Sequence, residues 1–433
     1  MTRLKVLISG GGVAGTALAF WLSKVGHDVT VVEWFPNLRT TGLQIDLRGP
    51  GIEVLRRMGL EQAFRDKAAP EEGLQFVDSS GRKRAYFPAN KSGKGAQSFT
   101  SEFEIMRGDL CRLIHDATEN RAKYIFGTSV ASFEEKQTNV EVHFKDGKTD
   151  FFDLLVGADG VFSATRKMIL GSDAADVFHP IGETNAYMTF QRPIQEGERY
   201  VGSMYLATKR RSMLVRRHNP KEMQLYLLLN YEDERLKRIH RGDVKEEKAA
   251  FTEIFQDAGG RTPELLEALQ DADDFYCERL GVVKMDTWVQ GRVALIGDAA
   301  YSPGGSGMGT SCALIGAYVL AGEISKHCGG PNAKDDTAVR VKGEDDLAAA
   351  LKAYDQTFRP YMNHVQAGLG KSPSWLMPSN AFGIAVLHWI LEAIAFLWVD
   401  PIVNWFMKGS EEKWKLPEYE KMIQAGGKNA AQA

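Results

Sequence analysis

The sequence has little of what would mark a disulfide-rich, metal-binding or nucleic-acid-binding protein. It contains only 4 cysteines in 433 residues, and its formal net charge is −3. The cysteines are Cys111, Cys277, Cys312 and Cys328. Because they lie far apart and form no Cys-x-x-Cys pair, we expect reduced thiols and neither a disulfide framework nor a zinc site. The near-neutral charge gives no reason to expect nucleic acid as a partner.

The sequence also lacks a recognisable catalytic triad or metal-ligand cluster. Its scattered histidines have no ligand spacing, so we interpret them as surface or hydrogen-bonded residues and predict no metal site. The ones considered are His115, His143, His218 and His240.

An unbroken apolar segment is missing at the N-terminus. Arg3 and Lys5 precede an apolar run, as in a secretory signal peptide, but a glycine cluster at 10–15 falls where the apolar core of a signal should be. We therefore predict a cytoplasmic protein. With 44% hydrophobic and 25% charged residues, the composition is that of a globular chain long enough for two or three domains.

The glycine cluster is the most informative feature that the sequence does have. An apolar strand at 4–9 leads into the turn Gly10-x-Gly12-x-x-Gly15 and then into a helix predicted over 16–25. This arrangement brings backbone N–H groups and a helix N-terminus up to a pyrophosphate. A second strand, 27–33, ends in Glu33, close to the spacing of about 20 residues expected for a carboxylate that binds a ribose hydroxyl. This spacing favours dinucleotide binding over a chance glycine-rich turn.

Two later strands end in similar small and polar residues. The strand at 154–157 is followed by Asp159-Gly160, and Ser163 and Arg166 begin a helix. This pattern is either a motif of the same kind as the glycine cluster or only an Asp-Gly turn that closes a core strand. The strand at 292–296 runs through Gly297-Asp298 into the glycine-rich segment 303–309 and a helix predicted over 310–325. Asp298 is placed to accept a polyol hydroxyl, and the glycine segment offers N–H donors to an electron-rich group.

These three motifs, in this order, resemble the three fingerprints of the class A flavin monooxygenases of the para-hydroxybenzoate hydroxylase type, which include the tetracycline-inactivating monooxygenases. The resemblance covers about residues 4–365. It implies an α/β fold, in which a Rossmann-like FAD-binding domain with a parallel sheet carries an inserted antiparallel-sheet substrate domain and a helical C-terminal part.

The resemblance also implies roles for individual residues. Gly10, Gly12, Gly15 and Glu33 would hold the ADP half of FAD, and Asp298 the ribityl chain. Arg107, at the head of a predicted helix, would contact the flavin-side pyrophosphate or the ribityl region; position alone allows a plain surface arginine equally well. The loop at 42–46 would border the isoalloxazine, 303–309 would line its pyrimidine edge, and Asp159 belongs to a motif that serves both FAD and the nicotinamide cofactor. The full set assigned to the cofactor is Gly10, Gly12, Val13, Ala14, Gly15, Glu33, Gly42, Leu43, Asp46, Arg107, Val130, Asp159, Asp298, Pro303, Gly307, Met308 and Gly309.

The chain departs from the family at two positions. Tyr301 stands where the family often has histidine, and Ser311 where asparagine is common. We expect the side-chain contacts to the flavin to differ and the backbone contacts to remain.

The chemistry that the resemblance implies is oxygen insertion. A C4a-hydroperoxyflavin would pass one oxygen atom from O2 to an electron-rich carbon of a small aromatic or polycyclic substrate. Since only one strand-GxGxxG-helix unit is present, NADPH or NADH is expected to bind transiently as the reductant. The alternatives are a flavin-dependent reductase or dehydrogenase of a lipophilic substrate and a non-catalytic flavin-binding scaffold.

The substrate domain is expected to interrupt the FAD-binding domain twice. In the strand predicted near 223–230, Gln224, Tyr226 and Asn230 share one face, which suits the roof of a substrate pocket or a solvated outer face. Arg211, Tyr226 and Asn230 are the candidate substrate contacts. The predicted domains are an FAD-binding domain over 1–72, 101–181 and 284–365, a substrate domain over 73–100 and 182–283, and a C-terminal helical segment and tail over 366–433.

The C-terminal part holds an apolar segment, 381–399, interrupted only by His388 and Glu392. Its length approaches that of a membrane span, but a central glutamate makes a span costly. The sequence favours a buried packing or dimer helix. It leaves open a helix that lies on a membrane surface or guards an apolar substrate entrance, with peripheral membrane contact through 381–407. The choice between monomer and homodimer also stays open.

Overall fold

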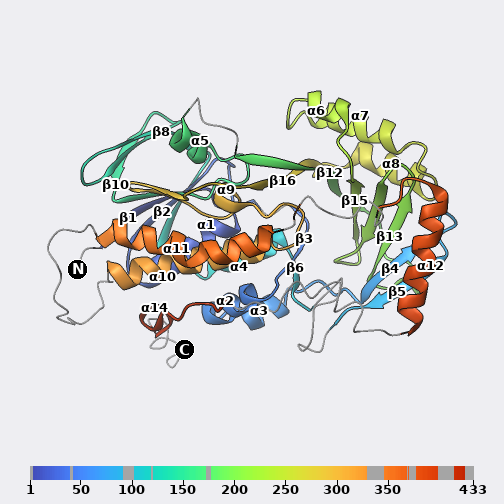
Figure 1. Ribbon diagram of the computed structural model, residues 1–433, viewed down its shortest axis with the longest axis horizontal. Coiled ribbons are helices and arrows are strands. Elements are labelled where there is room, and N and C mark those ends of the chain that lie inside the picture. The colour runs from blue at the N-terminus through green and yellow to red at the C-terminus, as the bar shows by residue number, and fades with distance from the viewer. Residues whose placement is uncertain are drawn as a thin grey trace.

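The computed structural model describes residues 3–39, 42–90, 102–118, 120–171, 177–328, 346–367, 369, 377–397 and 414–424. It contains two large sheets, one at each end of an elongated molecule (Figure 1). The predicted tail at 425–433 and the part of 381–407 beyond residue 397 lie outside the described residues.

The first large sheet has six strands and is parallel except at one edge. Its order is β17-β18-β11-β1-β2-β7, and only β17 runs antiparallel to its neighbour. The strands are β1 (Lys5–Ser9), β2 (Asp28–Glu33), β7 (Ala122–Phe126), β11 (Leu154–Gly157), β17 (Val289–Gln290) and β18 (Val293–Leu295). The central strands are near-continuous apolar runs because helices and a second sheet cover both faces. The predicted strands ending in the three motifs are therefore confirmed as neighbours in one sheet.

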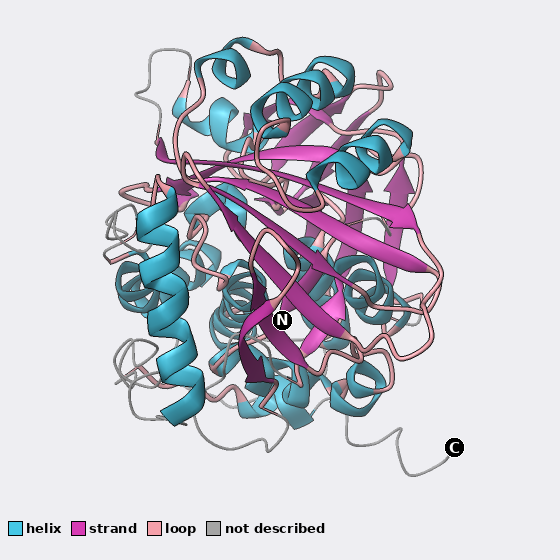
Figure 2. Ribbon diagram, turned by 90° about the vertical axis from the view of Figure 1, so that its right-hand side faces the viewer, coloured by secondary structure: helices cyan, strands magenta, loops and turns pink. Residues whose placement is uncertain are grey.

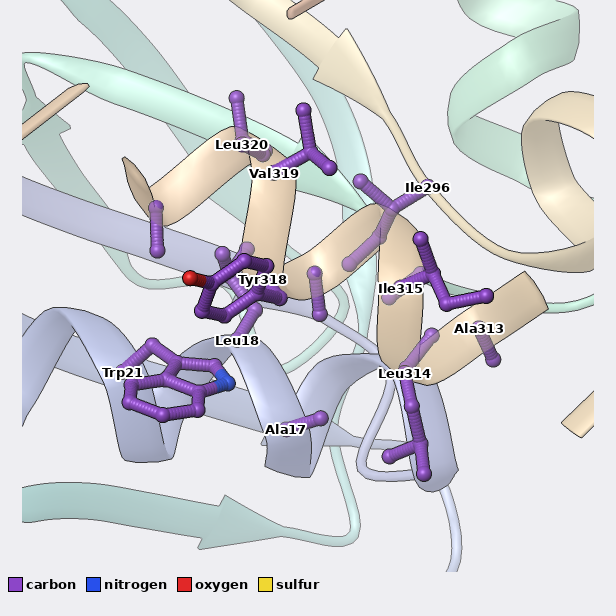
Figure 3. Close-up of a cluster of buried hydrophobic side chains, with 14 of the residues drawn as sticks. Ala17, Leu18, Trp21, Ile296, Ala313, Leu314, Ile315, Tyr318, Val319 and Leu320 are labelled. Carbon is purple, nitrogen blue, oxygen red and sulfur yellow. The ribbon is translucent and has the colours of Figure 1, made fainter. Parts of the chain in front are cut away.

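Helices cover one face of this parallel sheet. They are α1 (Val13–Lys24), α2 (Pro50–Met58), α4 (Arg107–Asp116), α10 (Gly309–His327) and α11 (Asp346–Gln366). Figure 3 shows α1 against α10, where Ala17 leaves room for close approach and the rings of Trp21 and Tyr318 meet edge to face with centroids 5.3 Å apart. This packing fixes the beginnings of both helices at the carboxyl ends of the strands.

The other face of the parallel sheet is covered by a small antiparallel sheet. Its strands are β8 (Val130–Glu135), β9 (Val140–Phe144) and β10 (Thr149–Phe152), with α5 (Ala164–Leu170) beside them. Val140, Val142 and Phe152 pack there against Leu7 and Leu155 of the parallel sheet. This small sheet therefore covers the apolar side chains of the parallel sheet on that face.

The second large sheet has seven strands in the order β16-β12-β15-β14-β13-β4-β5. All neighbouring pairs are antiparallel except β13 with β4. The strands are β4 (Gly73–Val77), β5 (Lys83–Pro88), β12 (Phe178–Gln191), β13 (Val201–Ala207), β14 (Arg211–Arg216), β15 (Glu222–Leu229) and β16 (Tyr276–Val283). The 14-residue strand β12 lies near one edge of this sheet, and the sequence patterns did not reveal it.

The two faces of the seven-stranded sheet have different covers. The face that we call the helix face carries Met213, Leu225 and Leu227 and packs against three helices. These are α6 (Glu234–Arg238), α7 (Val244–Phe255) and α8 (Thr262–Asp271) (Figure 1). The opposite face, here the inner face, carries Gln224 and Tyr226, both buried. A solvated outer face is therefore ruled out for these two side chains.

Short elements join the two large sheets. The two-stranded sheet of β3 (Gln44–Asp46) and β6 (Glu104–Met106) lies between them in Figure 1. The remaining short helices are α3 (Glu61–Arg65), α9 (Asp298–Tyr301) and α14 (Glu420–Gln424). The predicted domain boundaries follow this division, but they stay predictions.

The apolar C-terminal segment forms α12 (Ala381–Leu397), which lies along the seven-stranded sheet in Figures 1 and 2. Ile384, Leu387 and Leu391 pack on the inner face of β4, β5 and β13, and His388 is buried with them. Glu392 forms a 2.7 Å ion pair with Arg84 of β5. No helix within the described residues is both long and apolar enough to cross a membrane.

Candidate functional site

The three glycine-rich motifs meet at the carboxyl ends of the parallel strands. The turn after β1 is held by a 2.8 Å hydrogen bond from the Gly10 backbone N–H to the Val32 carbonyl. A methyl group at Gly15 would lie 1.9 Å from the Gly10 carbonyl oxygen, so α1 starts directly against the turn. No side chain caps the first N–H groups of α1, and these donors are therefore available to an anion.

Glu33 ends β2 beside this turn. Its Oε2 accepts a 2.7 Å hydrogen bond from the Gly11 backbone N–H, and its Oε1 accepts a 3.0 Å bond from the Phe35 N–H. Val130 begins β8 nearby, but its side chain packs in the apolar cluster with Leu7. The predicted positions of Glu33 and the glycine turn thus come together at one edge of the sheet.

Arg107 connects the first and third motifs. It lies at the first position of α4, and its backbone N–H donates to the Leu43 carbonyl at 2.8 Å. Its guanidinium Nη2 would be 4.0 Å from a methyl group at Gly12, and its Cδ 3.3 Å from one at Gly42. These contacts bring together residues that are far apart in sequence, including the predicted 42–46 loop.

Asp298 faces Arg107 across a recess. Its side chain is accessible to solvent, yet burial raises the pKa of Asp298 and the positive charge of Arg107 opposes that rise. A carboxylate that is both reachable and partly desolvated lies inside a recess rather than on the open surface. The recess also receives Glu278 of β16, whose pKa is raised by burial and then by the nearby charge of Asp298.

The glycine segment 303–309 borders the same recess and leads into α10. Gln366 of α11 holds its beginning, because Gln366 Nε2 donates to the carbonyls of Val283, Tyr301 and Ser302 at 2.9, 3.1 and 3.1 Å. Pro303 forms an isolated β-bridge with Val282 of β16. The segment is therefore fixed against the end of the seven-stranded sheet.

The two departures from the family pattern have structural explanations. The Tyr301 side chain is buried in the core, where its hydroxyl lies 3.4 Å from that of Tyr354. The Ser311 Oγ accepts a 2.8 Å hydrogen bond from the Arg48 backbone N–H. The side chains of Tyr301 and Ser311 therefore both make contacts within the protein.

Asp159 supports the local backbone. Its Oδ1 accepts from Ser163 Oγ at 2.5 Å, and its Oδ2 accepts from the backbone N–H and the hydroxyl of Thr165 at 2.9 and 3.0 Å. Arg166 donates to the carbonyls of Val161 and Ala299 at 2.6 and 2.9 Å. The second motif is thereby tied to the third, and a direct contact of Asp159 with a cofactor stays a prediction.

A row of three tyrosines crosses the inner face opposite the recess. The ring centroid of Tyr187 lies 5.4 Å from that of Tyr226 and 5.0 Å from that of Tyr276. Tyr226 donates a 2.8 Å hydrogen bond to Gln224 Oε1, and burial raises the pKa of Tyr226 to about 12. These side chains form an aromatic surface with polar edges, suited to a flat organic molecule.

A buried polar cluster connects this inner face to the β3–β6 sheet. Arg216 of β14 contacts the carboxylates of Glu71 and Glu104, and Gln44 Nε2 donates to the same two carboxylates at 3.0 and 2.5 Å. Burial and the charge of Glu104 raise the pKa of Glu71, while Arg216 opposes the rise. We refer to these four residues as the Arg216 cluster.

Arg211 is not part of this site, contrary to the prediction. It pairs in register with Leu229 on the helix face, and its guanidinium donates to the Thr208 carbonyl at 3.0 Å and to Asp257 at 2.5 Å. The register of β14 against β15 therefore turns Arg211 away from the recess. Tyr226 and Asn230 do lie on the inner face, as predicted from their alternation.

Sequence reasoning missed several residues of the inner face. Glu183, Asn185 and Tyr187 lie on β12, and Tyr276 and Glu278 on β16. The signal was the alternation of polar or aromatic side chains at every second position of these two strands. It could have been found if 178–191 had been considered as a strand.

A separate surface groove lies elsewhere. It has a volume of about 610 Å³ and is lined by Ser203, Val215 and Met223, of which Val215 and Met223 pack on the helix face. Its Arg217 and Arg199 already form ion pairs with acidic side chains. The convergence of the motifs identifies the recess, and not this groove, as the candidate site.

Comparison with known proteins identifies the family of this chain. Residues 3–337 match the family described as "FAD binding domain". The chain is 48% identical over 431 residues to the FAD-dependent monooxygenase asL4 of Sarocladium schorii, covering 98% of this chain and 100% of that one. It is 38% identical over 408 residues to the flavin-dependent monooxygenase eupH of Phoma sp., covering 90% and 91%.

A solved structure shows the same architecture. The tetracycline destructase Tet(55) superposes with a TM-score of 0.76 at 27% identity, covering 96% of this chain and 99% of that one. Sequence motifs, sheet topology and these relatives all agree. The chain belongs to the FAD-binding family and is a class A FAD-dependent monooxygenase.

Proposed function

We propose that this enzyme uses NADPH or NADH to reduce bound FAD and then inserts one oxygen atom from O2 into a small aromatic or polycyclic substrate. The observation that carries the proposal is the tyrosine row of Tyr187, Tyr226 and Tyr276 opposite the recess of Arg107 and Asp298. By its name, the similar tetracycline destructase Tet(55) acts on a polycyclic compound, which supports this substrate class.

The residues of the recess fit FAD. The turn Gly10–Gly15 offers N–H donors where a side chain would block a pyrophosphate, and Glu33 lies beside it for the ribose. Arg107 and Asp298 supply a cation for phosphate and a carboxylate for ribityl hydroxyls. When bound and reduced, the flavin supplies the oxygen-activating chemistry.

The chain's own residues have supporting tasks in this proposal. The aromatic inner face would hold the substrate flat and exclude water from it. The 303–309 segment, fixed by Gln366, would offer backbone N–H groups to the electron-rich edge of the ring system. The Arg216 cluster would hold the β3–β6 sheet in a fixed position against the seven-stranded sheet.

The deciding experiment weighs the product. Purified yellow enzyme is supplied with NADPH or NADH, candidate aromatic compounds and ¹⁸O2, and both substrate-stimulated reductant oxidation and product mass are measured. One labelled oxygen atom per product molecule is the expected result. A product without added oxygen would instead indicate a reductase or dehydrogenase, and a yellow protein that oxidises no reductant with any compound would indicate a non-catalytic flavin-binding scaffold.

We expect Asp298→Ala and Glu33→Ala each to weaken FAD retention by about tenfold or more, because each removes a carboxylate available to cofactor hydroxyls. Flavin absorbance per protein after gel filtration measures the loss. Asp28→Ala, at the exposed start of β2, is the matched control and should keep its flavin. Full occupancy in both site variants would show that these carboxylates have been misassigned.

We also propose that α12 contacts a membrane surface. Phe382, Trp389 and Phe396 are 80%, 68% and 86% exposed, and they form an uncharged stripe on the side away from the sheet. Exposed aromatic side chains along one side of an otherwise apolar helix are typical of interfacial helices.

This contact predicts that the enzyme sediments with phosphatidylserine-containing vesicles. The triple change Phe382→Ser, Trp389→Ser, Phe396→Ser should lower the bound fraction by about tenfold or more, since each ring buries substantial apolar area. Val244→Ser, at an exposed apolar residue of α7, should have no effect. If the triple variant instead dissociates a dimer and vesicle binding is absent, the stripe is a subunit interface and the membrane proposal is wrong.

A further inference from the structure

Glu183 occupies an unusual position in β12. A bulge between Pro180 and Glu183, with Gly182 at φ +80°, shifts the register of β12 against β16. The shift pairs Glu183 with Leu280, and the alternation of both strands places the two side chains on the inner face. Asn230, just after β15, lies in the same row.

The Glu183 carboxylate reaches the glycine segment that borders the recess. Its Oε2 would lie 3.4 Å from a methyl group at Gly305, and Leu280 Cδ1 would lie 3.2 Å from the same methyl group. Gly305 precedes the first residue of α10 by four positions. A carboxylate therefore stands between the segment assigned to the flavin and the face assigned to the substrate.

Glu183 differs from the other buried acids of this region. Glu71 and Glu104 share Arg216, whereas among the described side chains no cation forms an ion pair with Glu183. Its one polar partner there is Asn230, whose hydrogen bond partly offsets the effect of burial, and burial keeps the pKa of Glu183 above its ordinary value. The ionisable groups that face it from neighbouring strands are Glu278 on β16 and Glu232, which lies against Gly182.

Asn230 has an unused acceptor. Its Oδ1 is buried and has no hydrogen-bond partner within the described protein. A buried acceptor without a partner is costly, and a substrate hydroxyl at this place would satisfy it. Asn230 and Glu183 together therefore present two oxygen atoms to a donor group.

We infer that Glu183, oriented by Asn230, accepts the proton of a hydroxyl group on the aromatic ring of the substrate. The O–H bond of the substrate breaks, the proton forms a new O–H bond on Glu183 Oε2, and the electron pair stays on the substrate oxygen. That charge delocalises to the ring carbons ortho and para to it and makes them better acceptors of electrophilic oxygen. This inference rests on the proposed function and narrows the substrates to hydroxylated aromatic compounds.

The kinetic test compares pH profiles of resorcinol-stimulated oxygen insertion. Near pH 7, Glu183→Gln should be slower than wild type by about 10²-fold to 10³-fold, the usual contribution of a general base. The loss should shrink as pH rises through the pKa of the resorcinol hydroxyl, because solvent then removes the proton. Glu222→Gln, at the start of β15 and far from the recess, is the matched control.

A binding test gives an answer that does not depend on turnover. Wild-type holoenzyme should bind resorcinol at least about tenfold more tightly than 1,3-dimethoxybenzene, measured by calorimetry, because only the former can donate to a charged acceptor. Glu183→Leu should remove most of that preference. Asn230→Ala should reduce it less, since it loses the orienting partner and keeps the base.

Several outcomes would overturn the inference. The inference would be wrong if the wild-type enzyme bound resorcinol and 1,3-dimethoxybenzene equally tightly. It would also be wrong if the rate of oxygen insertion by Glu183→Gln at pH 7 were within threefold of the wild-type rate. A loss that is the same at every pH would show a structural role for Glu183. If no product carries added oxygen, the proposed function fails while the binding comparison still decides the role of Glu183.

Discussion

Replacing Gly15 with alanine is expected to abolish FAD retention and to destabilise the fold. The new methyl group would lie 1.9 Å from the Gly10 carbonyl oxygen, so α1 must move away from β1 or the turn must open. Overpacking of this kind costs about 1–3 kcal/mol of folding free energy, and either movement displaces the N–H groups that face the pyrophosphate. Flavin absorbance per protein and the thermal unfolding midpoint measure the two effects.

Gly12→Ala provides the matched comparison. A methyl group at Gly12 has no neighbour closer than the Arg107 guanidinium at 4.0 Å, so the apoprotein should unfold at the wild-type temperature. FAD binding should still fall sharply, because the methyl group occupies the space through which the pyrophosphate approaches the backbone. If Gly15→Ala retained flavin as wild type does, the close contact of α1 with the turn would have no role in cofactor binding.

Replacing Arg216 with methionine should be the most destabilising single change in the Arg216 cluster. It leaves the carboxylates of Glu71 and Glu104, 2% and 3% exposed, side by side without their cation. Removing one partner of a buried ion pair costs about 3–5 kcal/mol. Chemical denaturation at pH 7 measures the loss in free energy of unfolding.

The pH dependence of the stability of Arg216→Met follows from the direction in which the pKa of Glu71 is shifted. Without Arg216 the folded-state pKa of Glu71, already raised by burial and Glu104, rises further. A carboxyl group with a raised folded-state pKa destabilises the fold above its unfolded-state pKa, so the deficit should shrink as pH falls toward about 4. The double variant Arg216→Met, Glu71→Gln should recover part of the loss at pH 7. If the free energy of unfolding of Arg216→Met at pH 7 were within 1 kcal/mol of the wild-type value, the substitution would not leave a buried charge without its partner.

The sequence was sufficient to predict the parallel sheet and the convergence of its motifs. Glu33, Asp159 and Asp298 each follow an apolar run that is buried on both faces, and such runs occur where helices cover a parallel sheet. Because the carboxyl ends of parallel strands meet at one edge, the residues after them had to lie close together. The structure confirms this arrangement, and it adds that Arg107 joins the first and third motifs.

The inner face could not be predicted to the same degree. Arg211 and Tyr226 were both proposed as substrate contacts, but the register of β14 against β15 places Leu214, and not Arg211, opposite Tyr226. A shift of one residue in register reverses every side chain of a strand, and a single sequence does not specify that register. Glu183 was missed because the bulge at Gly182 interrupts the alternation from which a strand is inferred.

The order of strands in the parallel sheet has a consequence for biosynthesis. β11 lies between β1 and β18, and β18 is formed by residues 293–295. While the nascent chain emerges from the ribosome, one edge of β11 keeps its backbone N–H and C=O groups unpaired until the whole seven-stranded sheet has been translated. Exposed strand edges of this kind promote aggregation, and such long-range pairing is slow. The yield of folded enzyme should therefore depend on how long this edge stays exposed during synthesis.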